Sequence, residues 1–161
     1  GLRTVYDVCH NIAKIEEHNV HGAKQKVCVH RKGATRAFWA GRREVPSAYR
    51  SAGQPVIIPG TMETASFVLV GVPQAAETFA SVCHGAGRVM SRHEALRNYR
   101  GGDVQKNMAG RGIAVQSVEP ATLAEEAGGA YKNVDDVVAS VQAAGLARIV
   151  AKLVPMGVIK G

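Results

Sequence analysis

A histidine beside a cysteine opens the stretch of this sequence best suited to chemistry, CHGAGR at residues 83–88. His84 is followed by Gly85 and Gly87, and glycines let backbone N–H groups approach an anion closely. Arg88 adds a forked guanidinium donor of the kind that suits phosphate. A neutral imidazole can attack phosphorus and form a phosphoramidate, so His84 is a candidate nucleophile. Its alternative is a solvated histidine in a tight turn.

A second candidate phosphate loop lies in QPVIIPGTMETAS, residues 54–66. A run of apolar residues leads into Pro59-Gly60-Thr61-Met62, and Ser66 follows shortly after. Small and hydroxyl-bearing residues at the end of a strand can hold phosphate or ribose. Alone, this motif indicates a nucleotide site only weakly.

Positive charge gives a third indication. The chain carries a formal net charge of +7, which favours a polyanionic partner such as nucleic acid or a nucleotide. Arg31, Lys32 and Arg36 fall within one short span, VHRKGATRAF, and could contact an RNA backbone. An ordinary basic surface would explain the same residues.

Three cysteine–histidine groupings raise the alternative of a structural zinc site: Cys9-His10, Cys28-x-His30 and Cys83-His84. Neighbours on a strand point to opposite faces, so the first pair would not share one ion there. The second pair shares a face, but the alternation of a half-buried strand explains it equally well. We expect the isolated histidines His18, His21 and His93 to be surface residues.

The chain as a whole has the composition of a soluble globular protein, with 161 residues, 46% hydrophobic and 20% charged. An odd count of three cysteines without a CxxC motif points to a reducing cytoplasm. We expect neither a signal peptide nor a membrane span, since no apolar run is long enough for a bilayer. It begins with Gly1, and an ordered pattern follows at once, so we expect an upstream part to be missing.

Hairpins and short helices must position these residues. The sequence predicts a β-hairpin around HGA at 21–23, strands in PVIIPG and ASFVLVGV, and a long functional loop over 38–55. Short helices are predicted in SRHEALRNY and DVQKNMAG, and a strand in IAVQSV. The resulting class is α+β, a mixed sheet with hairpins and short helices.

Helix signals are clearest toward the end of the chain. Thr122 and Glu125 have the spacing of a capping box. After Asn133, valines recur at i, i+3, i+4 and i+7 from residue 134, and Gly145 is placed to end that helix. Residues 147–161 are predicted to close the chain as a strand.

Taken in order, several motifs resemble the RtcB family of RNA ligases. They are YDVCHNIAKIE, VHRKGATRAF, QPVIIPGTMETASFVLVG, CHGAGRVMSR, AYKNVDDVV and the terminal GVIKG. The resemblance runs over residues 1–161, as one C-terminal part of the RtcB fold, and covers about a third of the family's length.

The resemblance implies an enzyme that joins RNA ends bearing a 2′,3′-cyclic phosphate or 3′-phosphate to 5′-hydroxyl ends, in tRNA splicing and RNA repair. It implies GTP and two manganese ions as cofactors. The histidine of HGAGR, here His84, would attack the α-phosphate of GTP and carry GMP covalently. GMP would then pass to the RNA 3′-phosphate.

The family's site residues fall on matching positions of this chain. His10 matches a manganese ligand, Asn11 and Lys160 match nucleotide contacts, and Tyr131 matches an aromatic residue that stacks on guanine. The guanylate contacts match Pro59, Gly60, Thr61, Met62, Ser66, Gly85, Ala86 and Gly87. From charge and proximity, we predict that Arg88 and Arg92 contact RNA phosphate.

Two departures from the family pattern affect these expectations. Glu63 stands where the pattern has glycine, and its charge is expected to slow guanylylation by repelling phosphates. The family's upstream aspartate, cysteine and further histidine ligands are absent, so this chain alone is expected to be inactive. Two other readings remain open, a basic RNA- or nucleotide-binding module without catalysis and a zinc-stabilised structural domain.

Overall fold

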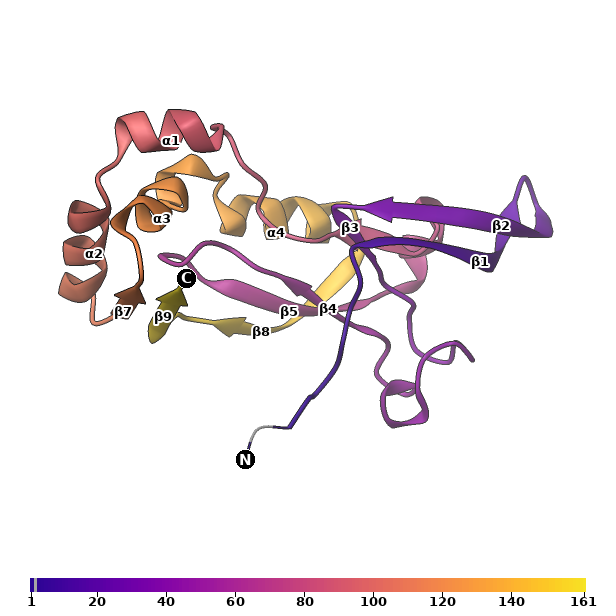
Figure 1. Ribbon diagram of the computed structural model, residues 1–161. Coiled ribbons are helices and arrows are strands. Elements are labelled where there is room, and N and C mark those ends of the chain that lie inside the picture. Colours follow the sequence, from indigo (N-terminus) through magenta and orange to yellow (C-terminus); the bar gives the residue numbers. More distant parts are fainter. Residues whose placement is uncertain (2) are drawn as a thin grey trace.

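The computed structural model describes residue 1 and residues 3–161, and a long β-hairpin is its most extended element (Figure 1). Strand β1 (Asn11–Val20) pairs antiparallel with β2 (Ala23–Lys32) along their whole lengths. His21 and Gly22 form the turn with φ of 52° and 84°. Positive φ at both turn residues is typical of a type I′ turn, which matches the twist of the strands. The predicted hairpin is confirmed.

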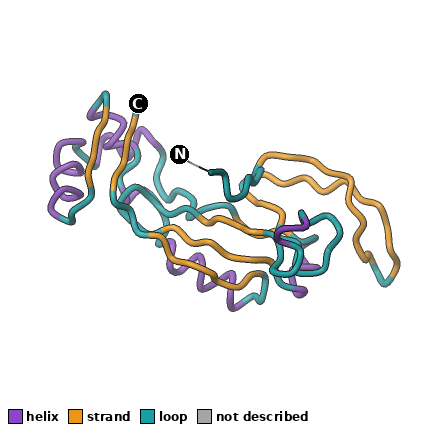
Figure 2. The backbone as a smooth tube through the Cα atoms, turned by 90° about the horizontal axis from the view of Figure 1, so that it is seen from below, coloured by secondary structure: helices purple, strands orange, loops and turns teal. Residues whose placement is uncertain are grey.

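The main core lies between a three-stranded antiparallel sheet and one helix. The sheet has the order β4 (Pro55–Ile58), β5 (Ser66–Gly71), β8 (Ala147–Leu153). Helix α4 (Val134–Ala143) runs along one face of this sheet (Figures 1 and 2). Its buried valines pack in one cluster with the apolar side chains of the sheet, among them Ile58 and Leu69.

Helix α4 begins after Asn133 and ends before Gly145, as predicted. The Asn133 side chain accepts a hydrogen bond from the backbone N–H of Asp135 at 2.9 Å. At the other end Gly145 has φ 66°, a left-handed conformation that ends helices. The valine spacing therefore predicted both the helix and the face that it buries.

Strand β6 (Ser81–Cys83) delivers the predicted nucleophile. It pairs antiparallel with β3 (Ala34–Arg36), and His84 follows directly after its last residue. The predicted loop between β3 and β4 contains one 3-10 turn, Ser47–Tyr49. Two further 3-10 turns span Pro73–Thr78 and Gly128–Ala130.

The end of the molecule opposite the hairpin holds three helices and a small parallel pair of strands (Figure 1). The helices are α1 (Arg92–Asn98), α2 (Gly101–Gly110) and α3 (Pro120–Glu125), and β7 (Ala114–Ser117) pairs with β9 (Gly157–Lys160). A second core joins these elements to the 59–66 loop through Met62, which packs with Met108 and Leu123. None of the helices in the described residues is long and apolar enough to cross a membrane.

Two sequence-based expectations about elements are wrong. Thr122 does not cap α3, because the helix begins at Pro120, whose missing N–H suits the first helical position. The chain does not close as one strand, since Val154–Met156 separate β8 from β9. The α+β class itself is confirmed.

Candidate functional site

His84 and His10 lie face to face. Their ring centroids are 3.9 Å apart with an angle of 18° between the planes. Gly33 connects the two residues through its backbone: its N–H donates to the His10 carbonyl and its carbonyl accepts from the His84 N–H, both at 3.0 Å. The hairpin and β6 therefore bring together two histidines that are 74 positions apart in the sequence.

The environment of His84 favours the neutral form of its ring. Burial lowers the pKa of His84 below its ordinary value, and the neighbouring His10 ring lowers it further. A neutral imidazole at physiological pH retains a lone pair for attack. Burial raises the pKa of the adjacent Cys83, which keeps that residue a thiol rather than a reactive thiolate. Of these two neighbours, His84 is therefore the better candidate nucleophile.

The two glycine-containing loops meet beside His84. The Ala86 N–H donates to the Pro59 carbonyl at 3.1 Å, so the loop at 84–88 lies directly against the loop at 59–66. A Cβ at Gly60 would lie 2.1 Å from the Ala65 carbonyl oxygen, so this position has no room for any side chain. The Gly60 N–H instead donates to the Ser66 hydroxyl at 3.3 Å.

A pocket of about 400 Å³ opens beside this junction. Seven of the residues predicted for nucleotide binding line it: Pro59, Gly60, Thr61, Met62, Ser66, Tyr131 and Lys160. Its other walls come from Glu126 and from Gly157–Ile159. The structure thus gathers into one pocket residues that the sequence spreads over a hundred positions. Asn11 is exposed beside His10, at the start of β1, and is not part of the lining.

Tyr131, predicted to stack on guanine, is held by Arg88. The guanidinium lies 4.7 Å from the centre of the tyrosine ring and donates from Nη1 to the tyrosine hydroxyl at 2.9 Å. The same hydroxyl donates to Glu126. Burial raises the pKa of Tyr131, and the Glu126 carboxylate raises it further. The sequence analysis did not single out Glu126, whose contact with the Tyr131 hydroxyl is made across the short 3-10 turn Gly128–Ala130.

The two arginines predicted to contact RNA phosphate have different surroundings. Arg88 also donates to the carbonyls of Met90 at 3.0 Å and Glu125 at 2.7 Å, so all three guanidinium nitrogens already have protein partners. The Arg92 side chain is 68% exposed, and its distances of 3.7–3.9 Å to carboxylates of α3 and its C-cap are long. Only Arg92 presents its guanidinium to solvent in the way that the prediction for RNA phosphate assumes.

The partners of the Glu63 carboxylate lie outside the 59–66 loop. Its Oε1 accepts from the Gly128 N–H at 2.6 Å, and Arg111 lies 3.9 Å from its other oxygen. Arg111 also donates to the Glu63 carbonyl at 2.6 Å. The carboxylate therefore connects the 59–66 loop to the turn that precedes Tyr131. These partners weaken the sequence-based expectation that the Glu63 carboxylate repels phosphates, because its charge is partly compensated by Arg111.

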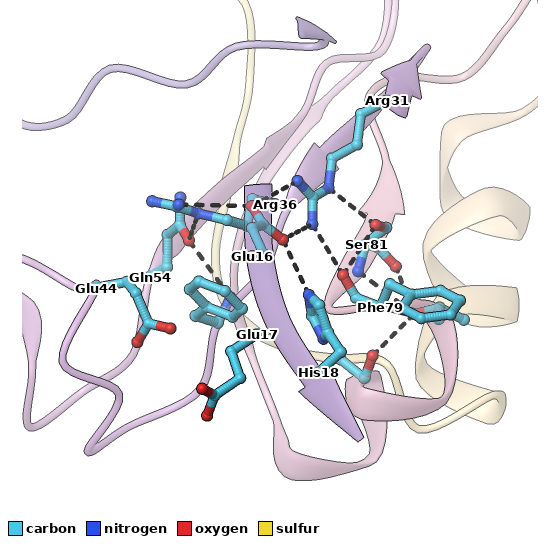
Figure 3. A network of polar contacts seen from close by, with 12 residues as sticks. Glu16, Glu17, His18, Arg31, Arg36, Glu44, Gln54, Phe79 and Ser81 are labelled. Atoms are coloured by element: carbon cyan, nitrogen blue, oxygen red, sulfur yellow. Dashed lines mark hydrogen bonds and ion pairs between the residues drawn. The ribbon is translucent and has the colours of Figure 1, made fainter. Parts of the chain in front are cut away.

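A buried ionic network holds the hairpin against the strand that carries His84 (Figure 3). Arg31, 3% exposed, donates through two nitrogens to the Glu16 carboxylate at 2.8 and 2.9 Å. It also donates to the Ser81 hydroxyl at 2.9 Å and to the Phe79 carbonyl at 2.8 Å. His18, 6% exposed, bonds to the same carboxylate at 3.0 Å.

This network corrects two predictions. Arg31 does not contact an RNA backbone, because its guanidinium is buried and its donors are used inside the protein. His18 is not a surface residue, because alternation along β1 puts it on the same inward face as Glu16. His21 and His93 are exposed, as predicted.

Metal ligands are too few for a complete site. Among residue 1 and residues 3–161, no group of three or more His, Cys, Asp or Glu side chains could hold a metal ion. Cys28 and His30 do lie side by side on β2, with Sγ and Nε2 3.4 Å apart, but they are two ligands on an exposed face. The histidine pair itself brings two imidazole rings together, and manganese binding by His10 stays a prediction.

The comparisons with known proteins agree with this geometry. The family model described as tRNA-splicing ligase RtcB matches residues 1–161. The chain belongs to the RtcB family. The tRNA-splicing ligase RtcB of Archaeoglobus fulgidus is 58% identical over 162 residues, which cover all of this chain and 34% of that protein.

In other RtcB relatives, too, the match covers only part of the relative's length. The Pyrococcus furiosus protein is 57% identical, and the match covers all of this chain and 17% of that protein. The RNA-splicing ligase RtcB of Mycobacterium bovis is 50% identical, with 99% and 37% covered. The chain thus spans between 17% and 37% of the length of these relatives, as a portion of an RtcB ligase.

Proposed function

We propose that this chain is the guanylate-carrying part of a longer RtcB RNA ligase and that His84 is its nucleophile. A ring nitrogen of His84 attacks the α-phosphorus of GTP, the bond to the β-phosphate oxygen breaks, and pyrophosphate leaves. The product is GMP joined to His84 through a phosphorus–nitrogen bond. The observation that carries this proposal is the position of His84, its pKa lowered, beside the pocket formed by the family's guanylate motifs.

In the steps that follow, RNA replaces the histidine. An oxygen of the RNA 3′-phosphate, which a 2′,3′-cyclic end supplies after hydrolysis, attacks phosphorus and releases His84. The 5′-hydroxyl of the second RNA end then attacks the activated 3′-phosphate, and GMP departs as the new phosphodiester forms. Broken or spliced tRNA ends are the proposed substrates, since the matched relatives are named as tRNA-splicing ligases.

Residues of this chain bind and orient the nucleotide. Tyr131, fixed by Arg88 and Glu126, presents an aromatic face on which guanine can stack. Lys160, which also lines the pocket, supplies a cation. The glycines of the loops at 59–66 and 84–88 would let the backbone approach the phosphates closely. Several backbone N–H groups of these loops, among them those of Gly60, His84 and Ala86, already have partners inside the protein, so part of the donors to phosphate would have to come from elsewhere.

The remaining parts of the enzyme come from outside this chain. We propose that residues 1–161 form the C-terminal part of one catalytic unit, and that the upstream part supplies most of the ligands for the two manganese ions. His10 would contribute one imidazole, and the ions would supply charge neutralisation at the triphosphate. We also propose a cytoplasmic location, in keeping with three free cysteines.

A covalent-adduct assay on the longer protein tests the nucleophile. With α-labelled GTP and manganese, we expect an acid-labile, covalently bound GMP that disappears in His84→Ala. His93→Ala, which removes an exposed histidine on α1, is the matched control and should keep the adduct. A persistent adduct in a folded His84→Ala protein would refute the assignment. Nucleotide binding without any adduct in the wild type would favour the non-catalytic binding module.

A further inference from the structure

We propose that the exposed face of the β1–β2 hairpin is a binding track for the phosphate backbone of single-stranded RNA. This proposal rests on the proposed function, which takes RNA as the substrate and places the reacting RNA end at His84. The track is a surface separate from the nucleotide pocket, and it would hold the substrate strand that leads to or from the reacting end.

Strand alternation creates this face. Alternate residues of a strand point the same way, so Lys24, Lys26, His30 and Lys32 lie together on one face of β2, while Val29 and Arg31 point inward and are buried. All four are exposed. With a rise of about 3.3 Å per residue, the row from Lys32 to Lys24 extends over about 26 Å. Such a row can follow a strand of RNA over several nucleotides.

The charge of the face suits a polyanion. Across from the lysines, β1 contributes Asn11, Ala13, Ile15, Glu17 and Asn19. Glu17 is the one acidic side chain on this face of residues 11–32, all of which the structure describes. Its carboxylate lies 3.6 Å from the Lys24 ammonium, but both side chains are more than half exposed, so solvent weakens the pair. Three ammonium groups thus face a single carboxylate.

These lysines are not needed to anchor the hairpin. Anchoring comes from the opposite face, where Glu16 and Arg31 form the buried network with Ser81. A row of cations that forms no part of the core, on a projecting ribbon (Figure 1), is available for a ligand. Binding of phosphate by lysine, unlike reading of base edges, does not depend on sequence.

The position of the face relates it to the reacting histidine. Lys32 pairs with Asn11, the neighbour of His10, and the His10 ring stacks on His84. One end of the row therefore lies at the nucleophile, and the row leads away from it toward the hairpin turn.

The end nearest the hairpin turn continues into a groove of about 680 Å³. Lys24, Trp39, Arg42 and Arg43 line it, together with Glu17 and Glu44. Arg42 lies over the Trp39 ring at 5.1 Å and is paired with Glu44. An aromatic side chain among basic groups is typical of surfaces that bind single strands by stacking and charge.

Charge reversal in the longer protein, with RNAs of two lengths, tests the track. The variant Lys24→Glu/Lys26→Glu changes the end far from His84, and Lys32→Glu changes the near end. The control Arg97→Glu/Arg100→Glu/Lys106→Glu reverses three exposed charges on α1, at the start of α2 and on α2. The probes are a fluorescent trinucleotide and a twenty-nucleotide single strand, both with a 3′-phosphate, and affinity is measured across a salt series.

We expect the far-end variant to lose roughly tenfold or more in affinity for the long RNA at low salt and to bind the trinucleotide within about twofold of the wild type. Lys32→Glu should weaken binding of both. A variant that combines Lys24→Glu, Lys26→Glu and Lys32→Glu should reduce the salt slope by about 2, since each lost phosphate contact contributes about 0.7 for a single strand. The control should keep the wild-type slope.

Two results would overturn the track: wild-type affinity of the far-end variant for the long RNA, or an equal loss in the control, which would mean a general charge effect. Guanylylation of His84, which uses no RNA, is measured on the far-end variant and on the control, and it should change less than about twofold in both. An absence of guanylylation in the wild type refutes the proposed nucleophile but leaves the RNA-binding result to decide the track.

Discussion

At the scale of single residues, Glu63 shows how contacts decide what a charge does. Its carboxylate accepts from the Gly128 N–H and lies near Arg111, so it fastens the nucleotide loop to the turn before Tyr131. We expect Glu63→Ala to lower the free energy of unfolding by roughly 1–2 kcal/mol and to weaken GTP binding, because a charge-assisted hydrogen bond is lost. Thermal unfolding and a nucleotide titration of the longer protein measure the two effects.

Glu63→Gln separates the hydrogen bond from the charge. The amide oxygen can still accept from Gly128, so this variant should retain most of the stability and of the GTP affinity. Glu63→Gly tests the sequence-based expectation directly. Faster guanylylation or tighter GTP binding in that variant would show that the carboxylate repels phosphate after all.

The two arginines that follow His84 should give different signatures. Arg88→Ala removes the support of Tyr131, so we expect a loss of about 1–3 kcal/mol in stability and weaker nucleotide binding. Arg92→Ala removes an exposed cation, so RNA binding should weaken similarly for all sequences, with a salt slope smaller by about 0.7. Stability and RNA-binding measurements on both variants check this. A flatter salt slope in Arg88→Ala would restore the phosphate contact that the sequence predicted.

The order of the motifs, and not any one motif alone, indicated which residues lie together: seven of the residues predicted for nucleotide binding line one pocket, while Asn11 and residues 85–87 lie outside its lining. Their binding of a nucleotide stays a prediction. The sequence could not predict which donors are already used. Arg31 and Lys32 are neighbours with the same charge, yet one is buried against Glu16 and the other is exposed. This difference depends on which face of the strand a residue occupies and on which elements pack against that face. A count of charges in the sequence gives neither.

At the scale of elements, the hairpin and β6 form the mechanical link between the two histidines. Arg31 bonds Glu16 on β1 and Ser81 on β6, while Gly33 bonds His10 and His84. Removing one partner of a buried ion pair costs about 3–5 kcal/mol, since the other charge is left unpaired. We expect Arg31→Met to cause such a loss and to slow adduct formation.

Denaturant unfolding, hydrogen exchange of β1 and β2, and the adduct assay measure these effects in the longer protein. Lys26→Met, on the opposite, exposed face of β2, is the matched control and should stay within about 0.5 kcal/mol. Glu16→Leu combined with Arg31→Met should recover part of the stability, because no buried charge remains. Unchanged exchange in Arg31→Met would contradict the anchoring role.

The same network predicts a dependence of stability on pH. Burial alone would raise the pKa of Glu16, but hydrogen bonds from Arg31 and His18 outweigh it, and the pKa lies below the ordinary value of 4.5. Its contribution to stability is therefore full above pH 4.5 and is lost as pH falls through the lower folded-state pKa. Unfolding free energies measured against pH should decline more steeply below 4.5 in the wild type than in Glu16→Gln. Parallel curves would contradict this.

Local sequence patterns predicted most helices and strands, because the signal for each of these elements lies within a short stretch of sequence. Alternation gave the hairpin, and valine spacing gave α4. The failures occurred where a local signal competed with a neighbour. Pro120 begins α3 before Thr122 can cap it, and the parallel pairing of β7 with β9 joins segments forty positions apart, which no local period reveals.

At the scale of the whole molecule, apolar surface gathers near the end of the chain. Val150, Leu153, Val154 and Met156 are exposed along β8 and the segment after it, with Met156 at 83%. β7 and β9 form a two-stranded parallel sheet, an arrangement that proteins normally bury on both faces. These features are what a surface covered by the rest of a longer protein would show.

We therefore expect the 161-residue chain alone to bind manganese weakly, to form no GMP adduct and to self-associate. A single imidazole at His10 binds such an ion poorly, and without metal the triphosphate is neither neutralised nor aligned for His84. Calorimetry with manganese, the adduct assay and light scattering test the three claims, with the longer protein as the positive control. Val154→Lys/Met156→Lys should reduce self-association without restoring the adduct, because it changes the exposed surface and adds no ligand. A robust guanylylated species from the isolated chain would refute the dependence on upstream ligands and would direct attention to Cys28 and His30, the 3.4 Å pair on β2.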